Sequence, residues 1–217
     1  MIKQSELSNQ LRIYVITDQH MYWKKNPIDL MWQSINGGAT CIQLRHKGEP
    51  SRHVIEFGRC IKKLCDLKGV LFIVNDHITL FELVNADGFH VGKNDLNIVE
   101  ARLRIGHRKI LGRTLGKDDT LDFPTALVDY LGVGPIYETS SKRDAGSPCG
   151  VAFPDYARAQ FKKPIVAIGG ITEKNIHEIS PHTDGVAFIS SVARSSDPLL
   201  TIQNMRLKFY EAQKVIN

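Results

Sequence analysis

The sequence predicts an α/β protein with a single domain, a (β/α)8 TIM barrel over residues 1–217. Eight short β-branched apolar runs recur along the chain, longer amphipathic or polar stretches separate them, and no break in composition divides them. Such alternation is typical of repeated βα units that feed a parallel sheet. A chain of 217 residues is long enough for one barrel of this kind.

The predicted strands are rich in valine, isoleucine, leucine and aromatic residues. They are residues 13–16, 41–44, 71–74, 88–91, 109–112, 130–133, 165–168 and 186–189. An open doubly wound sheet is the main alternative, and it also places ligands at the carboxyl ends of its strands. The barrel is favoured because the strands continue in single βα steps and no Gly-x-Gly-x-x-Gly follows the first of them.

Two of the intervening helices have clear sequence signals. Ser51 can cap a helix that ends before Gly69, and Asp197 followed by Pro198 can begin the last helix. Apolar residues at helical spacing support both, namely Val54, Phe57, Ile61 and Leu64 in the first and Leu199, Ile202, Met205 and Phe209 in the second. The helices after the third and fourth strands must be brief because those connections are short.

The composition excludes several classes of protein. Hydrophobic residues make up 42% and charged residues 24%, and 28 basic against 23 acidic residues give a net charge of +5. These proportions argue against a disordered, collagenous or disulfide-stapled chain. The densest basic stretch, residues 102–109, contains no aromatic residue on which a base can stack. We interpret it as a solvated helix end and expect no nucleic-acid partner.

The apolar runs predict a cytoplasmic protein without a membrane partner. Residues 1–10 read as a polar N-terminal extension that lacks the apolar centre of a signal peptide, and the longest apolar run, residues 70–74, is too short to span a bilayer. The four cysteines form no Cys-x-x-Cys pair, so we expect reduced thiols without catalytic or metal-binding roles. The sequence leaves the oligomeric state open.

Polar residues alternate at the end of the second predicted strand. Gln43, Arg45 and Lys47 project to one side because successive side chains of a strand point to opposite faces. This side faces either solvent or the mouth of the barrel. Helices cover the outer face of a parallel barrel strand, which favours the mouth, where the two cations would face an anion.

Two carboxylates follow neighbouring strands. Asp76 comes directly after the third strand and Asp95 shortly after the fourth. Mg²⁺ takes only one or two protein carboxylates and completes its octahedron with water and substrate phosphate, so this pair is a candidate site for Mg²⁺ bound to a diphosphate. Each aspartate has a second interpretation, as the cap of the short helix that follows it.

Hydroxyl groups and glycines follow the last three strands. Thr139, Ser141 and Lys142 come after the sixth strand, Gly170 is the second of two glycines after the seventh, and Ser190 follows the eighth. Barrels frequently build a phosphate site from the loops after strands seven and eight, although a tight turn without a ligand also explains the glycines. Two anion sites at one rim indicate a transferase that acts on two phosphorylated small molecules.

The motifs at these positions resemble those of thiamine-phosphate synthases over nearly the whole chain. Each motif alone is weak evidence, but seven in the right order on a predicted barrel are specific. The matching segments are Tyr14-Val-Ile-Thr17, Gln43-Leu-Arg45-His-Lys47, Val74-Asn75-Asp76, Asp87-Gly-Phe-His-Val-Gly92, Gly134-Pro-Ile-Tyr-Glu-Thr139-Ser-Ser-Lys142, Ala167-Ile-Gly-Gly-Ile171 and Ile189-Ser190.

The resemblance implies a reaction and a set of site residues. The reaction couples 4-amino-5-hydroxymethyl-2-methylpyrimidine diphosphate with hydroxyethylthiazole phosphate by dissociative displacement of diphosphate, without a protein nucleophile. Asp76 and Asp95 are implied to hold Mg²⁺. The residues implied to bind diphosphate are Arg45, Lys47, Asn75 and Lys142. Of these, the expected catalytic residues are Arg45, Lys47 and Lys142. Gln43 and Thr114 are the residues implied to lie near the pyrimidine. The residues implied to surround the thiazole phosphate are Thr139, Ser141, Gly170, Ile189 and Ser190.

Three positions depart from the pattern that the resemblance implies. Lys93 stands where glutamine is usual, Glu138 replaces a common proline, and Thr114 replaces a common serine while keeping its hydroxyl. Lys93 adds a cation beside Asp95 that can either help to bind diphosphate or compete with the metal.

Two other functions are compatible with the same barrel. Thiazole tautomerases resemble this chain at Gly112-Arg113-Thr114, but their acid/base histidine corresponds to Gly116, which cannot transfer a proton. A noncatalytic regulatory protein that binds thiamine precursors has little reason to keep Asp76 and Asp95. The eight histidines show no metal-ligand spacing, so structural or peripheral roles are expected for them, His90 included.

Overall fold

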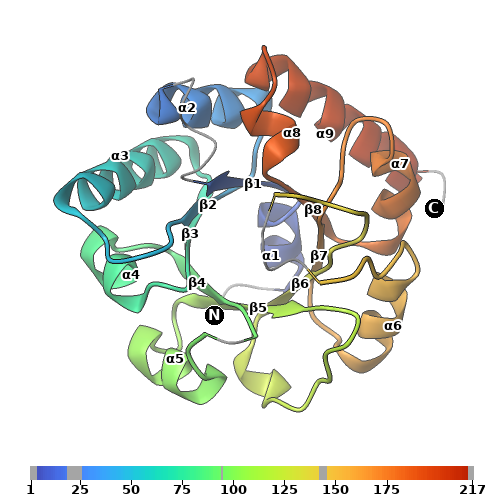
Figure 1. Cartoon of the computed structure of the whole chain (residues 1–217), viewed down its shortest axis with the longest axis horizontal. Helices are drawn as coiled ribbons and strands as arrows, with labels where there is room; N and C mark the ends of the chain where they lie inside the picture. The colour runs from blue at the N-terminus through green and yellow to red at the C-terminus, as the bar shows by residue number, and fades with distance from the viewer. Residues whose placement is uncertain (1–3, 19–25, 94, 142–145, 215–217) are drawn as a thin grey trace.

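The computed structural model of the chain describes residues 4–18, 26–93, 95–141 and 146–214. Within these residues, eight strands pair in parallel in chain order, and the last strand pairs with the first (Figure 1). The sheet therefore closes into a barrel, and Figure 1 shows helices arranged around it. This confirms the predicted (β/α)8 architecture.

All eight predicted strands are present. Their bounds are β1 Ile13–Asp18, β2 Cys41–Arg45, β3 Leu71–Asn75, β4 Gly88–Val91, β5 Ile110–Leu115, β6 Tyr130–Val133, β7 Ile165–Ile168 and β8 Gly185–Phe188. The largest shift is in β5, which was predicted at residues 109–112.

Helices connect the strands and follow the last one. Among the described residues they are α1 Gln4–Gln10, α2 Pro27–Gly37, α3 Arg52–Lys68, α4 Ile78–Val84, α5 Ile98–Ile105, α6 Phe153–Gln160, α7 Ile176–Ile179, α8 Ser190–Ala193 and α9 Pro198–Lys214, with short 3-10 helices η2 Thr125–Leu127 and η3 Ser180–His182. No helix in this part of the chain is both long and apolar enough to cross a membrane.

The predicted helix signals operate as expected. The Ser51 hydroxyl accepts from the backbone N–H of Val54 at 3.4 Å, and Gly69 ends α3 with a φ of 66°, a left-handed conformation that suits glycine. The Asp197 carboxylate accepts from the backbone N–H of Leu200 at 3.0 Å at the start of α9. The helices after β3 and β4 are brief, at 7 and 8 residues.

The N-terminal segment differs from the predicted polar extension. Residues Gln4–Gln10 form α1, which lies inside the ring of strands in Figure 1, at the end where the strands begin. Leu7 and Leu11 are buried among the inward-facing side chains of the barrel. A Cβ atom on Gly185 would lie 2.1 Å from the Leu11 carbonyl oxygen, so only glycine lets the segment approach this closely. The sequence did not predict α1 because Leu7 and Leu11 are the only two buried leucines of this segment, and two apolar residues are too few to show helical spacing among polar neighbours.

Side chains on the strands alternate between two apolar regions. On β1, for example, Ile13 and Val15 pack toward the surrounding helices, whereas Tyr14 and Ile16 point into the barrel. The outer region is the larger one, because the apolar faces of the helices contribute to it. The alternation points every second side chain of a strand into the barrel. Because the strands are parallel, their polar carboxyl ends meet at one end of the barrel, which is its mouth.

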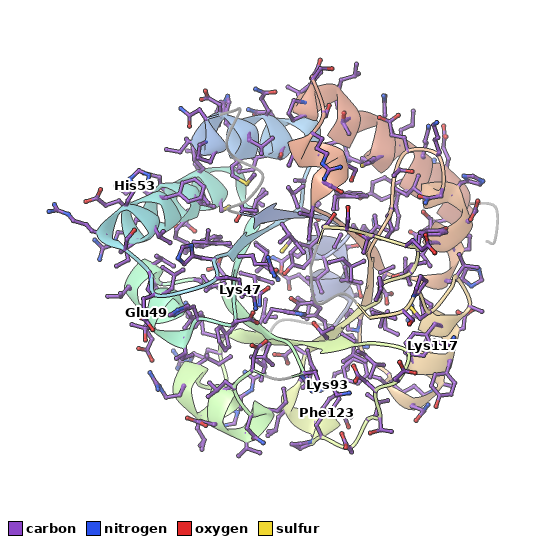
Figure 2. The ribbon with its side chains drawn as sticks, viewed as in Figure 1. Lys47, Glu49, His53, Lys93, Lys117 and Phe123 are labelled. Carbon is purple, nitrogen blue, oxygen red and sulfur yellow. The ribbon has the colours of Figure 1, made fainter. Side chains whose placement is uncertain are left out.

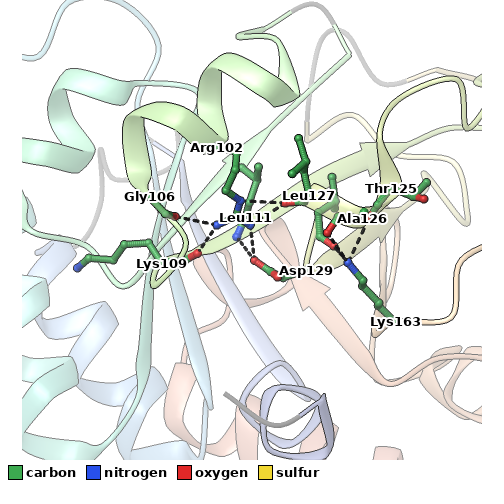
Figure 3. Close-up of polar contacts among 10 residues, drawn as sticks. Arg102, Gly106, Lys109, Leu111, Thr125, Ala126, Leu127, Asp129 and Lys163 are labelled. Carbon is green, nitrogen blue, oxygen red and sulfur yellow. Dashed lines mark hydrogen bonds and ion pairs between the residues drawn. The ribbon is translucent and has the colours of Figure 1, made fainter. Parts of the chain in front are cut away.

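The first residue of the basic stretch 102–109 is part of the framework. Arg102 is only 6% exposed, and its guanidinium contacts the Asp129 carboxylate at 2.6 Å (Figure 3). The backbone carbonyl oxygens that accept from it, at 2.7–3.0 Å, belong to Gly106, Lys109 and Leu127. The same Asp129 oxygen accepts from the backbone N–H of Leu111 at 2.8 Å. Our interpretation of the whole stretch as solvated is therefore wrong at Arg102, because the distant Leu127 and Asp129 bury its guanidinium together with Gly106 and Lys109 of the same stretch.

Replacing Arg102 is expected to destabilise the barrel. In Arg102→Met the buried carbonyl oxygens and Asp129 lose their donors, and we expect the free energy of unfolding to fall by about 2–4 kcal/mol. The matched control is Arg104→Met on the same helix, whose ion pair with Glu82 is half exposed on both sides, and there the change should stay within about 0.5 kcal/mol. Urea denaturation measures both values, and equal losses in the two variants would contradict this role for Arg102.

Candidate active site

A cavity of about 340 Å³ opens at the carboxyl ends of the strands. Most of the predicted site residues line it, although they come from seven different strands or the loops that follow them. They are Arg45, Lys47, Asn75, Asp76, Asp95, Thr114, Thr139, Ser141, Gly170, Ile189 and Ser190. Figure 2 shows Lys47 at the barrel mouth, whereas Glu49 and His53 lie farther out toward α3.

Two predicted site residues are placed differently. Gln43 is 2% exposed and does not line the cavity; its side-chain amide points into the barrel interior and donates to the Tyr14 hydroxyl at 2.8 Å. Lys142 lies outside the described residues. Arg45, on the same face of β2 as Gln43 but two residues nearer the mouth, is 7% exposed and reaches the cavity.

The ends of β2, β3 and β4 form a charged cluster. Lys47 Nζ lies 2.7 Å from an Asp76 carboxylate oxygen, and the Asn75 side-chain amide donates to the other oxygen of Asp76. Asp95 accepts from the backbone N–H of Gly92 at 2.7 Å and is in hydrogen-bond contact with Asp76. The two predicted metal ligands therefore lie side by side, with the Lys47 ammonium against one of them.

The two carboxyl groups have opposite pKa shifts. Burial, together with the neighbouring Asp95 carboxylate, raises the pKa of Asp76 to about 6 despite the nearby Lys47. Burial also acts to raise the pKa of Asp95, but hydrogen bonds from Asp76 and from the Gly92 N–H hold it below the ordinary value. Below about pH 6 the pair therefore holds one proton, with Asp76 as its carrier.

Neither aspartate caps a helix. The N-cap residue of α4 is His77, and the side chain that caps α5 is Asn97, which accepts from the Val99 N–H at 2.8 Å. Asp76 instead has a φ of 59°, a left-handed conformation that is uncommon outside glycine and clusters at functional sites. The cap interpretation of both aspartates is therefore wrong, and both carboxylates face the cavity.

This donor set fits a hard divalent cation with few protein ligands. Two adjacent carboxylates carry two negative charges once both are ionised, and Mg²⁺ needs no more protein ligands than these when phosphate and water complete its shell. No group of three or more histidine, cysteine, aspartate or glutamate side chains suited to a metal occurs in the part of the chain that the structure describes.

The cation of Lys93 is turned toward a different carboxylate. Lys93 Nζ lies 2.6 Å from Asp119, in the loop after β5, and Asp119 also accepts from the backbone N–H of Gly116 at 2.8 Å. Lys93 and Lys117 both line the cavity, and Figure 2 shows them on the β5 side of the mouth. Sequence reasoning placed Lys93 beside Asp95 and gave no indication of Asp119, because the partner lies on another loop.

The opposite side of the cavity carries hydroxyl groups. The Ser141 hydroxyl donates to the Ser190 hydroxyl at 2.8 Å, and the Ser141 N–H donates to the Thr139 hydroxyl at 3.2 Å. The neighbouring Gly169 and Gly170 have φ values of 99° and 68°, and a Cβ atom on Gly170 would lie 2.6 Å from the Glu138 carbonyl oxygen. Glycine is needed here because the loops after β6 and β7 touch backbone to backbone.

A chain of polar side chains lies beneath the cavity, and sequence reasoning missed it. It runs from Gln43 through Tyr14, Tyr130 and His90 to Thr114, and each neighbouring pair is within 3.0 Å. The sequence signal that could have found it is the inward position of two tyrosines and a histidine on predicted barrel strands, where apolar residues are usual. His90 is thus an interior residue.

Comparisons with known proteins identify the family of this chain. A sequence model described as thiamine monophosphate synthase matches residues 13–192. The thiamine-phosphate synthase of Moorella thermoacetica is 40% identical over 199 residues, which are 91% of this chain and 95% of that protein. The thiamine-phosphate synthase of Chlorobium phaeobacteroides is 37% identical over 186 residues, which are 85% of this chain and 89% of that protein.

A solved structure gives the same result. The thiamine phosphate pyrophosphorylase of Pyrococcus furiosus superposes with a TM-score of 0.85 at 31% identity and covers 95% of this chain and 98% of its own. The matches extend over the barrel and over every strand end that lines the cavity. The chain therefore belongs to the thiamine monophosphate synthase family.

Proposed function

We propose that this transferase joins 4-amino-5-hydroxymethyl-2-methylpyrimidine diphosphate to hydroxyethylthiazole phosphate, releasing diphosphate and forming thiamine phosphate. One observation carries the proposal: a single cavity has a cation and carboxylate cluster on one side and a hydroxyl and glycine cluster on the other. The first suits a metal-bound diphosphate, and the second suits a single phosphate. A reaction between two phosphorylated molecules requires both in one pocket.

The diphosphate end is assigned to β2 and β3. Arg45 offers a planar set of donors that matches phosphate oxygens, Lys47 offers a point charge, and the Asn75 amide can donate to a phosphate oxygen. Lys142, outside the described residues, is assigned to the same group. Charge accumulates on the diphosphate as its bond to carbon breaks, so donors that are already in place stabilise the transition state more than the ground state.

Asp76 and Asp95 are the residues that would hold Mg²⁺. A bound Mg²⁺ would supply Lewis-acid stabilisation of the departing diphosphate oxygens. The chain's own part is to hold the two carboxylates in contact and to place Arg45 and Lys47 around the same oxygens.

The carbon–nitrogen bond can form without a protein nucleophile. No histidine or cysteine of the described residues lines the cavity, and the Cys41 and Cys65 thiols are buried, which raises the pKa of each. An electron-rich aminopyrimidine can stabilise the methylene cation left when diphosphate departs, and the thiazole nitrogen then captures it. The residues here bind and orient the two partners, which favours the dissociative route.

The thiazole phosphate is assigned to the hydroxyl side of the cavity. Thr139, Ser141 and Ser190 present hydroxyl groups, and the loop at Gly170 lets backbone amides approach an anion. Ile189, 7% exposed, adds an apolar contact for the thiazole ring at the same rim.

A coupled assay tests the function. Purified protein is incubated with both substrates and Mg²⁺, and products are resolved by chromatography. Thiamine phosphate with equimolar diphosphate is the expected result. Isomerised thiazole phosphate alone would identify a tautomerase, and binding without turnover would identify a regulatory protein; either outcome overturns the proposal.

Removal of one carboxylate should separate turnover from thiazole binding. We expect Asp76→Ala to lower kcat by about 100-fold or more, because the departing diphosphate loses the site that holds its counter-cation. The affinity for thiazole phosphate, measured by calorimetry, should not change, since Asp76 lies on the other side of the cavity. Asp66→Ala on the exposed face of α3 is the matched control. Parental turnover in Asp76→Ala would refute the metal assignment.

The proton shared by the carboxylates should compete with the metal. Asp76, with a pKa of about 6, must release its proton to ligate a cation, so affinity for Mg²⁺ is full above that pH and is lost as the pH falls through it. Between about pH 7 and about pH 5 the expected loss is about tenfold, as for one competing proton. Calorimetry with Mg²⁺ measures it in the presence of the pyrimidine diphosphate. An affinity that does not depend on pH over this range would contradict the assignment.

The hydroxyl cluster should determine the KM for one substrate only. In Ser190→Ala the thiazole phosphate loses one hydrogen bond, and we expect its KM to rise about fivefold while kcat and the KM for the pyrimidine diphosphate stay unchanged. The control is Ser196→Ala, an exposed serine beyond the end of α8. A rise in the KM for the pyrimidine diphosphate instead would show that the two phosphate sites are assigned the wrong way round.

A further inference from the structure

Five side chains form a continuous hydrogen-bonded chain across the barrel interior, and we call it the inner chain. The Gln43 amide nitrogen donates to the Tyr14 hydroxyl at 2.8 Å, and the hydroxyls of Tyr14 and Tyr130 are 3.0 Å apart. Tyr130 lies 2.9 Å from Nδ1 of His90, and Nε2 of His90 lies 2.9 Å from the Thr114 hydroxyl. Thr114 alone of the five lines the cavity.

The barrel is shaped to hold the inner chain. A Cβ atom on Gly112 would lie 2.3 Å from the Tyr130 ring and 2.5 Å from His90 Nδ1, so any residue other than glycine at position 112 would push Tyr130 and His90 apart. A Cβ atom on Gly132 would lie 3.1 Å from the His90 ring. β5 and β6 therefore both have glycine at the inward position where Tyr130 and His90 contact each other.

One order of protons satisfies every contact of the inner chain when Gln43 donates and His90 is neutral. Tyr14, which is also in hydrogen-bond contact with the Cys41 thiol, accepts from the amide and gives its proton to Tyr130 in this order. Tyr130 in turn gives its proton to Nδ1 of a neutral His90, so that ring carries its proton on Nε2 and donates to the Thr114 oxygen. The Thr114 proton is then left to point at the cavity.

The electrostatics of the two tyrosines agree with this order. Both hydroxyls are fully buried, and burial raises the pKa of each far above its ordinary value, so both stay protonated. The contact with Tyr14 acts to lower the pKa of Tyr130, as expected when Tyr14 is the donor and Tyr130 the acceptor. A buried chain with every member paired is also rigid.

We propose that the inner chain fixes the Thr114 hydroxyl as a hydrogen-bond donor to an acceptor atom of the substrate, a ring nitrogen of the aminopyrimidine. Gln43 then acts from the far end of the chain, and Tyr14, Tyr130 and His90 are positioning residues. The proposal rests on the proposed function for the identity of the substrate, but the order of protons can be measured without it. It predicts a preference for a ring nitrogen over a ring C–H at this position, because a donor gains nothing from a C–H group.

The first test is spectroscopic and uses the parent protein with labelled histidine. Nitrogen chemical shifts identify the protonated nitrogen of His90, which is assigned by its loss in His90→Gln. We expect the neutral ring with the proton on Nε2. In Tyr130→Phe, which keeps the ring but removes the donor to Nδ1, we expect a mixture of the two tautomers. A parent ring with its proton on Nδ1, or a doubly protonated ring, would overturn the proposal whether or not the protein makes thiamine phosphate.

The second test is a double-mutant cycle in the coupled assay. Thr114→Val removes the hydroxyl, and we expect the KM for the pyrimidine diphosphate to rise about fivefold, the cost of one hydrogen bond, while the KM for thiazole phosphate is unchanged. Tyr130→Phe should give a similar rise, and combining the two changes should add nothing further. Thr114→Ser should restore the parental KM, and exposed Tyr156→Phe is the control.

Independent losses that add in the double variant, or equal rises in the KM values of both substrates, would show a merely structural role and overturn the proposal. If no variant and no parent protein turns over, the proposed function fails, yet the His90 tautomer still decides the order of protons. The two proposals therefore fail separately.

Discussion

Alternation of side chains along closed parallel strands is the constraint on which the rest of this molecule depends. Every second residue of each strand must point into the barrel, so the interior is filled in layers whatever the residue types are. At the end covered by α1 the inward residues are apolar, as Leu71 and Ile110 show. Farther along the axis they include tyrosine, histidine and glutamine beside isoleucine, and at the mouth Arg45 and Asn75 reach the cavity. The chemistry is thus graded along the barrel axis.

The inner chain lies between the apolar end of the barrel and the charged cavity at its mouth. Polar side chains inside a protein cost free energy unless each finds a partner, and here Tyr14, Tyr130 and His90 satisfy one another and reach Gln43 and Thr114 at the two ends. Because the members are fixed by packing and by hydrogen bonds at the same time, the cavity floor is held in one arrangement. That rigidity suits a binding site whose hydrogen-bond donors must stay in place.

Sequence reasoning succeeded where the signal is local and failed where the partners are distant. Strand positions and the cap at Ser51 depend on neighbouring residues, and both were predicted. The convergence of the site residues on one rim followed from topology alone. Arg102 was misread because two of its partners, Leu127 and Asp129, are 25 and 27 residues away and cannot be inferred from a local pattern. The contact between Tyr14 and Tyr130 joins residues 116 apart, and nothing in either segment announces the other. The choice between cap and ligand for Asp76 needed the geometry of the loop.

Charge balance at the mouth bears on Lys93, one of the three positions that depart from the pattern that the resemblance implies. A diphosphate that enters beside Asp76 and Asp95 meets like charge, and Lys47 already contacts one of the two carboxylates. Without a further cation the carboxylates would oppose the diphosphate that we propose Arg45 and Lys47 attract, and a divalent cation at this place would offset that repulsion. Lys93 does not supply that cation, because Asp119 holds its ammonium group at 2.6 Å on the β5 side. Lys93 is therefore paired with the loop that follows β5, which balances its charge, and not with the carboxylate pair.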